Sequence, residues 1–161
     1  MRCAACVYRG GRCHASQEAR FNHTLQCVWK CSRLPDGTVM DRVEFEELVR
    51  QALDDLPAEF AARLENVVVV VEDEPDPQLL HSLGMNPRHQ TLFGLYQGVP
   101  LHQRGASYGG VLPDKISIYY RPMVRACVTP DQIRRQVRKT VIHEIAHFFG
   151  LDDKQIRSLG Y

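Results

Sequence analysis

The feature that most constrains this chain is a histidine pair near its C-terminal end, in an HExxH pattern over residues 143–147. Residues four apart on an α-helix lie one turn apart on the same face, so His143 and His147 can direct two imidazole nitrogens at one metal ion. The pattern extends to HExxHxxGxxD through Gly150 and Asp153. The glycine permits a sharp turn after His147, and the side chain of Asp153 can then fold back to the same ion.

A catalytic zinc site commonly has three protein ligands and one open position for water. His143, His147 and Asp153 would supply such a set, with the adjacent Asp152 as the nearest competitor of Asp153. Glu144 is turned toward the same side and reaches a water on the ion rather than the ion itself. The pattern therefore predicts one catalytic Zn²⁺, held by the two histidines and Asp153, with Glu144 as the general base.

The motif lies on a helix expected over residues 130–149. Thr129 and Gln132 have capping-box spacing, Pro130 suits the first helical position, and Gly150 supplies a stop. The histidines lie opposite an apolar stripe, on the side of Gln136 and Thr140, and Glu144 lies at the seam, where partial burial would raise its pKa. The stripe consists of Ile133, Val137, Val141, Ile145 and Phe148.

Upstream of this helix, periodicity predicts further helices over residues 42–55 and 57–64 and strands over 67–71, 91–96 and 115–120, with a short edge strand over 99–101. The run 67–71 is five valines, apolar on both faces, and is expected to be a buried central strand. The acidic stretch 72–77 lacks the EF-hand pattern and is interpreted as a solvated loop. The glycine-rich stretch 102–114 is expected to be a mobile loop.

A change in composition divides the chain near the turn signal at residues 34–37. Residues 1–39 carry six basic and two acidic side chains, whereas residues 40–161 carry fourteen basic and seventeen acidic ones. We expect residues 1–39 to be a cysteine-rich extension, either disordered or the product of a mis-called start before Met40, and residues 40–161 to be the domain. A metal knuckle is the less favoured alternative for five cysteines in the extension: Cys3, Cys6, Cys13, Cys27 and Cys31.

Over residues 41–161 the sequence resembles the small bacterial zincin-like metallopeptidases, or minimal zincins. The resemblance rests on FEELV (45–49), ALDDLP (52–57), NVVV (66–69), GLYQGVPL (94–101), LPDKI (112–116) and TVIHEIAHFFGLDD (140–153). It implies a compact α+β fold with a small mixed β-sheet packed on helices, a long C-terminal active-site helix, and zinc held by the two histidines and the aspartate.

The resemblance also implies a zinc metallopeptidase, which hydrolyses peptide bonds with a metal-activated water and binds its substrate as an extended strand at a sheet edge. Segments 91–101 and 115–120 are candidates for that edge. Zincins usually supply a second group that stabilises the oxyanion, and four residues remain open for this role: His102, Tyr108, Tyr119 and Tyr120.

A rival interpretation is a metal-binding or peptide-binding module with little or no hydrolytic activity. Glu144 argues against it, because a structural metal site needs no carboxylate beside its first ligand. The net charge of +1 gives no reason to expect nucleic acid, and the basic cluster of Arg134, Arg135, Arg138 and Lys139 is typical of a solvated helix face. No apolar run approaches the roughly 20 residues of a membrane span. With no secretory signal visible, we expect a cytoplasmic protein without a membrane partner.

Overall fold

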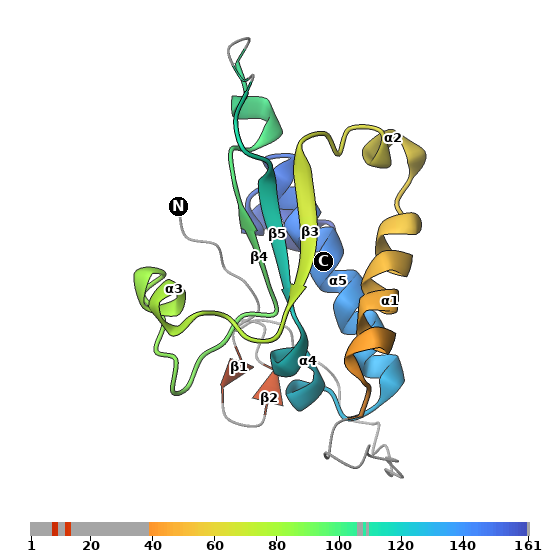
Figure 1. The fold of residues 1–161 in the computed structure, drawn as a ribbon, viewed down its shortest axis with the longest axis vertical. Helices are drawn as coiled ribbons and strands as arrows, with labels where there is room; N and C mark the ends of the chain where they lie inside the picture. Colours follow the sequence, from red (N-terminus) through yellow and green to blue (C-terminus); the bar gives the residue numbers. More distant parts are fainter. Residues whose placement is uncertain (1–7, 10–11, 14–38, 106–107, 109, 161) are drawn as a thin grey trace.

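The computed structural model describes residues 8–9, 12–13, 39–105, 108 and 110–160 (Figure 1). Near the N-terminus, two short strands pair in antiparallel fashion, β1 (Tyr8–Arg9) and β2 (Arg12–Cys13). The remaining elements follow in the order α1 (Arg42–Asp54), α2 (Ala58–Ala61), β3 (Val67–Glu72), α3 (Pro77–Ser82), β4 (Gly94–Gln97), the 3₁₀ turn η1 (Leu101–Gln103), β5 (Asp114–Tyr119), α4 (Tyr120–Ala126), α5 (Pro130–Phe148) and α6 (Asp153–Ser158).

The main sheet has three strands in the order β3-β5-β4. β3 runs parallel to β5 and β4 runs antiparallel to it, so the sheet is mixed. The prediction that residues 67–71 form a central strand is wrong, because β5 lies in the centre and β3 lies at an edge, where Val68 is 44% exposed. Valine favours a strand through its branched Cβ but does not determine whether that strand has one neighbour or two.

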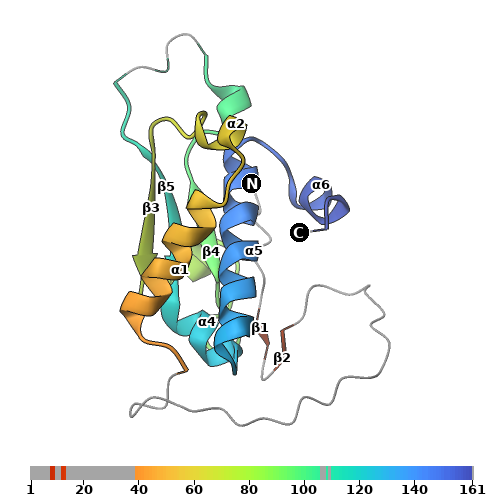
Figure 2. The ribbon, with the colours of Figure 1, turned by 90° about the vertical axis from the view of Figure 1, so that its right-hand side faces the viewer.

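One face of the sheet is covered by α5, which lies behind the strands, and α1 packs against α5 beside β3 (Figures 1 and 2). Between these elements lies the main core, to which α1 contributes Phe45 and Val49 and β5 contributes Ile116 and Ile118. From the apolar stripe of α5, four residues belong to this core: Ile133, Val137, Val141 and Ile145. The α+β fold expected from the sequence is therefore confirmed, including its mixed sheet and its long C-terminal helix.

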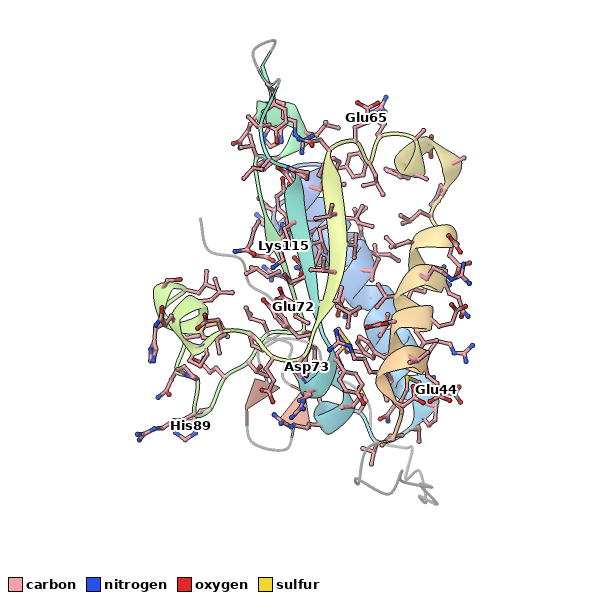
Figure 3. All side chains as sticks on the ribbon, in the orientation of Figure 1. Glu44, Glu65, Glu72, Asp73, His89 and Lys115 are labelled. Atoms are coloured by element: carbon pink, nitrogen blue, oxygen red, sulfur yellow. The ribbon has the colours of Figure 1, made fainter. Side chains whose placement is uncertain are left out.

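The opposite face of the sheet is covered in part by α3. Leu80 of this helix is buried against Leu95 of β4 and Tyr119 of β5. Farther along the same face, the ammonium of Lys115 lies 2.5 Å from a carboxylate oxygen of Glu72, and both side chains lie at the front of the sheet (Figure 3). α3 therefore stands beside the free edge of β4, where the candidate site lies.

Several predicted elements differ from those observed. The helix expected over 57–64 is shorter in the structure, where only α2 is helical. The strand expected over 91–96 begins three residues later, at Gly94. The edge strand expected over 99–101 is wrong, because Pro100 is followed by the 3₁₀ turn η1. Helix α4 was not predicted, because Arg121-Pro122 suggested only the end of the preceding strand. Pro122 lies in the first turn of α4, where a helix does not need the missing N–H.

The predicted boundary at residue 39 stays a prediction, because four of the five N-terminal cysteines lie outside the described residues, as do the other residues from 14 to 38. In the part of the chain that is described, no helix has both the length and the apolar character needed to span a bilayer.

Candidate metal centre

Helix α5 carries the HExxH pattern and is fixed along its whole length by its apolar stripe. The Thr129 side chain caps the helix by accepting a hydrogen bond from the Gln132 backbone N–H at 3.2 Å. All five residues of the predicted stripe are buried, with exposed fractions between 0% and 4%. His143 and His147 are then left partly exposed on another side of the helix. Thr140, expected beside them, is instead buried under β4.

Three side-chain atoms converge at the end of this helix. The Nε2 atoms of His143 and His147 lie 3.0 Å apart, and Oδ1 of Asp153 lies 3.3 Å and 3.5 Å from them. A tetrahedral ion with bonds of roughly 2.0–2.1 Å separates its ligands by about 3.3–3.4 Å. The three atoms are therefore spaced as ligands of one zinc ion would be, and the donor set of two imidazoles and a carboxylate suits zinc.

A different contact acts on each of the two histidine rings. Nδ1 of His147 lies 2.9 Å from the carbonyl oxygen of Leu151, and donation to that oxygen leaves the Nε2 lone pair free. Burial lowers the pKa of His143, and the neighbouring His147 lowers it further, so the neutral imidazole is favoured there.

The carboxylates of Asp152 and Asp153 have different surroundings. Asp152 is the N-cap of α6, and its Oδ1 accepts a hydrogen bond from the Gln155 backbone N–H at 2.8 Å. Asp153 begins the helix and turns toward the histidines. The reversal between α5 and α6 depends on Gly150, whose φ of +91° is a conformation that side chains rarely adopt. The capping-box spacing of Asp152 and Gln155 was the sequence signal that distinguishes the two aspartates.

Glu144 is almost completely buried, with 1% of its surface exposed. Its Oε2 accepts a hydrogen bond of 2.8 Å from the Tyr96 backbone N–H in β4. Burial raises the pKa of Glu144 to about 8 and the charge of Asp153 adds to the rise, while the Tyr96 N–H opposes it. The upward shift of this pKa agrees with the expectation from the sequence. The Glu144 side chain is, however, far more completely buried than its position beside the apolar stripe suggested.

The free edge of β4 runs past this centre. The Tyr119 N–H donates to the Phe93 carbonyl, so by the alternation of an antiparallel pair Leu95 and Gln97 also bond to β5, and the backbone groups of Gly94 and Tyr96 point away from it. The interpretation of residues 115–120 as a sheet edge is wrong, because β5 has a neighbour on both sides.

A cleft of about 430 Å³ lies between the β4 edge, α3 and the turn after α5. Its lining includes His147 and Asp153, whereas His143 and Glu144 are not part of it. Among the four residues considered for the oxyanion, only His102 lines the cleft. The hydroxyls of Tyr108 and Tyr120 donate to Asp114 and to the Met40 carbonyl, and Tyr119 is buried. The full lining is Leu79, Leu83, Leu95, Tyr96, Gln97, Gly98, Pro100, His102, Gln103, His147, Gly150, Leu151, Asp152 and Asp153.

A buried ion pair that the sequence did not reveal fixes the loop that carries His102. The guanidinium of Arg104 is 8% exposed and donates to Asp114 at 2.5 Å, to the Val99 carbonyl at 3.0 Å and to the Glu65 carbonyl at 3.1 Å. Burial opposes ionisation of Asp114, but donors that include Arg104 outweigh it and lower its pKa. The expectation of a mobile loop over 102–114 therefore does not hold at Arg104 and Asp114.

His102 also lies directly against the turn that follows α5. A Cβ at Gly150 would lie 1.8 Å from Nδ1 of His102, so the ring occupies the space that any side chain at position 150 would need. A glycine at position 150 therefore permits both the positive φ of the turn and the close approach of the His102 ring. The loop after β4 and the turn before Asp153 are thereby packed together.

Comparison with known proteins agrees with this geometry. A family model described as zincin-like metallopeptidase matches residues 64–161, a range that includes the main sheet, the cleft and the whole HExxHxxGxxD pattern. A search of curated proteins found no match. The family match covers more than half of the chain, and the chain belongs to the zincin-like metallopeptidase family.

Proposed function

We propose that this protein is a zinc-dependent peptidase in which His143, His147 and Asp153 hold one Zn²⁺ and Glu144 is the general base. The observation that carries the proposal is the convergence of three ligand atoms within 3.0–3.5 Å of one another, beside a buried carboxylate on the same helix. The buried carboxylate is what a purely structural metal site would not need.

Zinc, when bound, would act as a Lewis acid that polarises the scissile carbonyl and makes a bound water more acidic. Glu144 would take the proton of the attacking water and pass it to the leaving amine. Its hydrogen bond with the Tyr96 N–H fixes the carboxylate that would accept this proton.

The substrate is proposed to lie as an extended strand along the free edge of β4. The carbonyl groups of Gly94 and Tyr96 point away from β5 and are placed to accept hydrogen bonds from a peptide backbone. A peptide in this position runs past the cleft that His147 and Asp153 line.

A second candidate function is a metal-dependent peptide-binding module with little hydrolysis. The observation that favours it is the near-complete burial of Glu144, which does not line the cleft and whose Oε2 is held by a backbone N–H. The two candidates share the metal ligands and differ in whether Glu144 reaches a water at the ion.

Metal analysis and a peptide-library digest of the full chain distinguish these functions. A peptidase should contain about one zinc per chain and cleave peptides in a reaction that a chelator stops. Glu144→Gln should keep the zinc and lose roughly 10²–10⁴-fold in rate, because an amide has the same size but is no base. Zinc binding without any cleavage would support the binding module. Loss of zinc in Glu144→Gln would show that Glu144 holds the metal.

A further inference from the structure

The wall of the cleft that faces α3 is apolar. Leu79 and Leu83 lie four residues apart on α3 and its C-terminal cap, and both are half-buried. Together with Leu95 of β4 they line the cleft that also contains His147 and Asp153. Leu80, between them in sequence, is 3% exposed and belongs to the core beneath. α3 thus presents two leucines to the site and uses a third to anchor itself.

An extended peptide on the β4 edge would direct alternate side chains to this wall. Side chains along β4 alternate between its two faces. Leu95 faces α3, whereas Gly94 packs on Thr140 of α5 and Tyr96 contacts the ring of Phe148. A strand added beside β4 continues the same alternation. Every second side chain of the peptide would therefore point to the α3 side, where Leu79 and Leu83 line the same cleft as His147 and Asp153.

The distribution of charge around the cleft favours an uncharged peptide side chain at the leucine wall. Apart from the phenol of Tyr96, the ionisable residues of its lining are His102, His147, Asp152 and Asp153, and none of the described lining residues is a lysine or an arginine. An acidic side chain that packs against the leucines would find no lysine or arginine there to pair with, and burial of an unpaired charge is costly. An apolar side chain would instead gain contact with three leucines.

We infer that the substrates are extended peptide segments with a large apolar side chain, such as leucine, methionine or phenylalanine, beside the scissile bond, and that Leu79 and Leu83 select this side chain. The inference rests on the proposed peptidase function for its site. It goes further in naming the substrate class and the residues that recognise it. Its test uses binding as well as cleavage, so that recognition and hydrolysis are measured separately.

The first measurement is peptide binding to the zinc-loaded, full-length Glu144→Gln variant. The probe is a peptide library capped at both ends and randomised at each position. Selection for large apolar residues at one position is expected, with leucine bound about tenfold more tightly than alanine there. Leu79→Ala should reduce this preference several-fold. Binding without side-chain selection, or selection for charged residues, would overturn the inference.

The second measurement changes the charge of the wall. Leu83→Lys in the same protein should move the preference from leucine toward glutamate by at least tenfold, because a lysine there supplies the missing cationic partner. A new preference requires a folded site, so loss of folding cannot imitate it. Leu159→Lys is the matched control, since Leu159 is 63% exposed and lies outside the cleft lining. An unchanged preference in Leu83→Lys would refute the role of Leu83.

The cleavage digest of the wild-type protein separates the two proposals. Selective binding without cleavage would reject the peptidase function and retain the recognition of apolar segments. Chelator-sensitive cleavage at sites without an apolar neighbour would retain the peptidase and reject the inference.

Discussion

Asp152 and Asp153 are neighbours in the chain, yet one is committed to a helix cap and the other faces two imidazoles. The cap uses Oδ1 of Asp152, which is bonded to the Gln155 N–H. Oδ1 of Asp153 lies within 3.5 Å of both histidine Nε2 atoms. The two neighbouring carboxylates therefore have different partners, the start of α6 for Asp152 and the histidines of α5 for Asp153.

We therefore predict opposite results for the two alanine variants. Asp153→Ala should weaken zinc binding strongly, and Asp153→His should preserve it, because imidazole is also a zinc ligand. Asp152→Ala should leave zinc affinity nearly unchanged and cost about 0.5–2 kcal/mol of stability through the lost cap. Zinc titrations and urea unfolding measure these effects. Loss of zinc in Asp152→Ala alone would identify Asp152 as the third ligand.

Glu144 links the stability of the zinc-free protein to pH. Burial raises its pKa from the ordinary value of 4.5 to about 8. Between these values the native state holds a proton that the unfolded chain has released, so the free energy of unfolding falls as pH rises. Glu144→Gln removes this contribution. We predict that the variant gains stability relative to the wild type between pH 4.5 and pH 8 and that the difference is constant above that range.

Urea unfolding in the presence of a chelator, repeated across that pH range, tests this prediction. Glu65→Gln is a suitable control, because Glu65 is exposed and its side chain stands away from the sheet (Figure 3). A difference between Glu144→Gln and wild type that does not change with pH would show that Glu144 titrates normally in the native state.

For the individual residues of the site, the sequence predicted that His143, His147 and Asp153 lie close together but not how the Glu144 carboxylate is bound. The spacing of His143, His147 and Asp153 follows from helix geometry and a turn. The hydrogen-bond partner of Glu144 is the backbone of Tyr96, 48 residues away, and a backbone N–H has no signature in the sequence. The ion pair of Arg104 and Asp114 could not be predicted for a related reason, because it depends on the path of a loop in the folded protein.

Among the elements, α5 and β4 approach each other at Gly94. A Cβ at this position would lie 2.6 Å from Cγ2 of Thr140 and 2.9 Å from Cγ and Oε1 of Glu144. Contacts under 3.0 Å force a neighbour to move, and here the neighbours are the buried side chains of Thr140 and Glu144. The missing side chain of Gly94 therefore allows Glu144 to reach the β4 backbone.

Gly94→Ala should consequently lower the free energy of unfolding by about 1–3 kcal/mol, as overpacking of a core does. The combination with Thr140→Ala should recover part of the loss, because it removes the closest atom. Gly105→Ala should be nearly neutral, since nothing lies within 4 Å of a Cβ there. Urea midpoints of the four proteins provide the comparison. Equal stability of Gly94→Ala and Gly105→Ala would contradict the tight contact.

The long amphipathic helix was predictable because its stripe of apolar residues repeats over about four turns and both its ends carry cap signals. The sheet order was not, because a run of valines indicates a strand without indicating its neighbours. α4 was missed for a local reason, since a proline within a first turn is compatible with a helix and the sequence pattern alone favoured a stop.

For the whole molecule, the domain boundary is the main prediction that stays open. Met40 is 6% exposed, and its carbonyl accepts a 2.7 Å hydrogen bond from the Tyr120 hydroxyl. Asp41 caps α1 by accepting a hydrogen bond from the Glu44 N–H at 2.8 Å. The contacts of the domain described here therefore include residue 40.

We predict that a protein beginning at Met40 folds and binds zinc like the full chain. A second truncation, beginning at Arg42, removes the cap and the buried methionine and should be less stable by a few kcal/mol. Thermal unfolding and zinc titration of both proteins check this. If the protein that begins at Met40 lacks the main thermal transition, residues 1–39 are part of the fold.

All three proposed ligands come from the stretch 143–153, a short segment at the end of one helix and the start of the next. Closing so short a loop costs little chain entropy, so the denatured polypeptide can also gather these side chains around an ion. A ligand that binds the denatured state as well as the native state stabilises the fold by less than its affinity implies. Zinc should therefore raise the melting temperature of this protein by less than its affinity for the native state would predict.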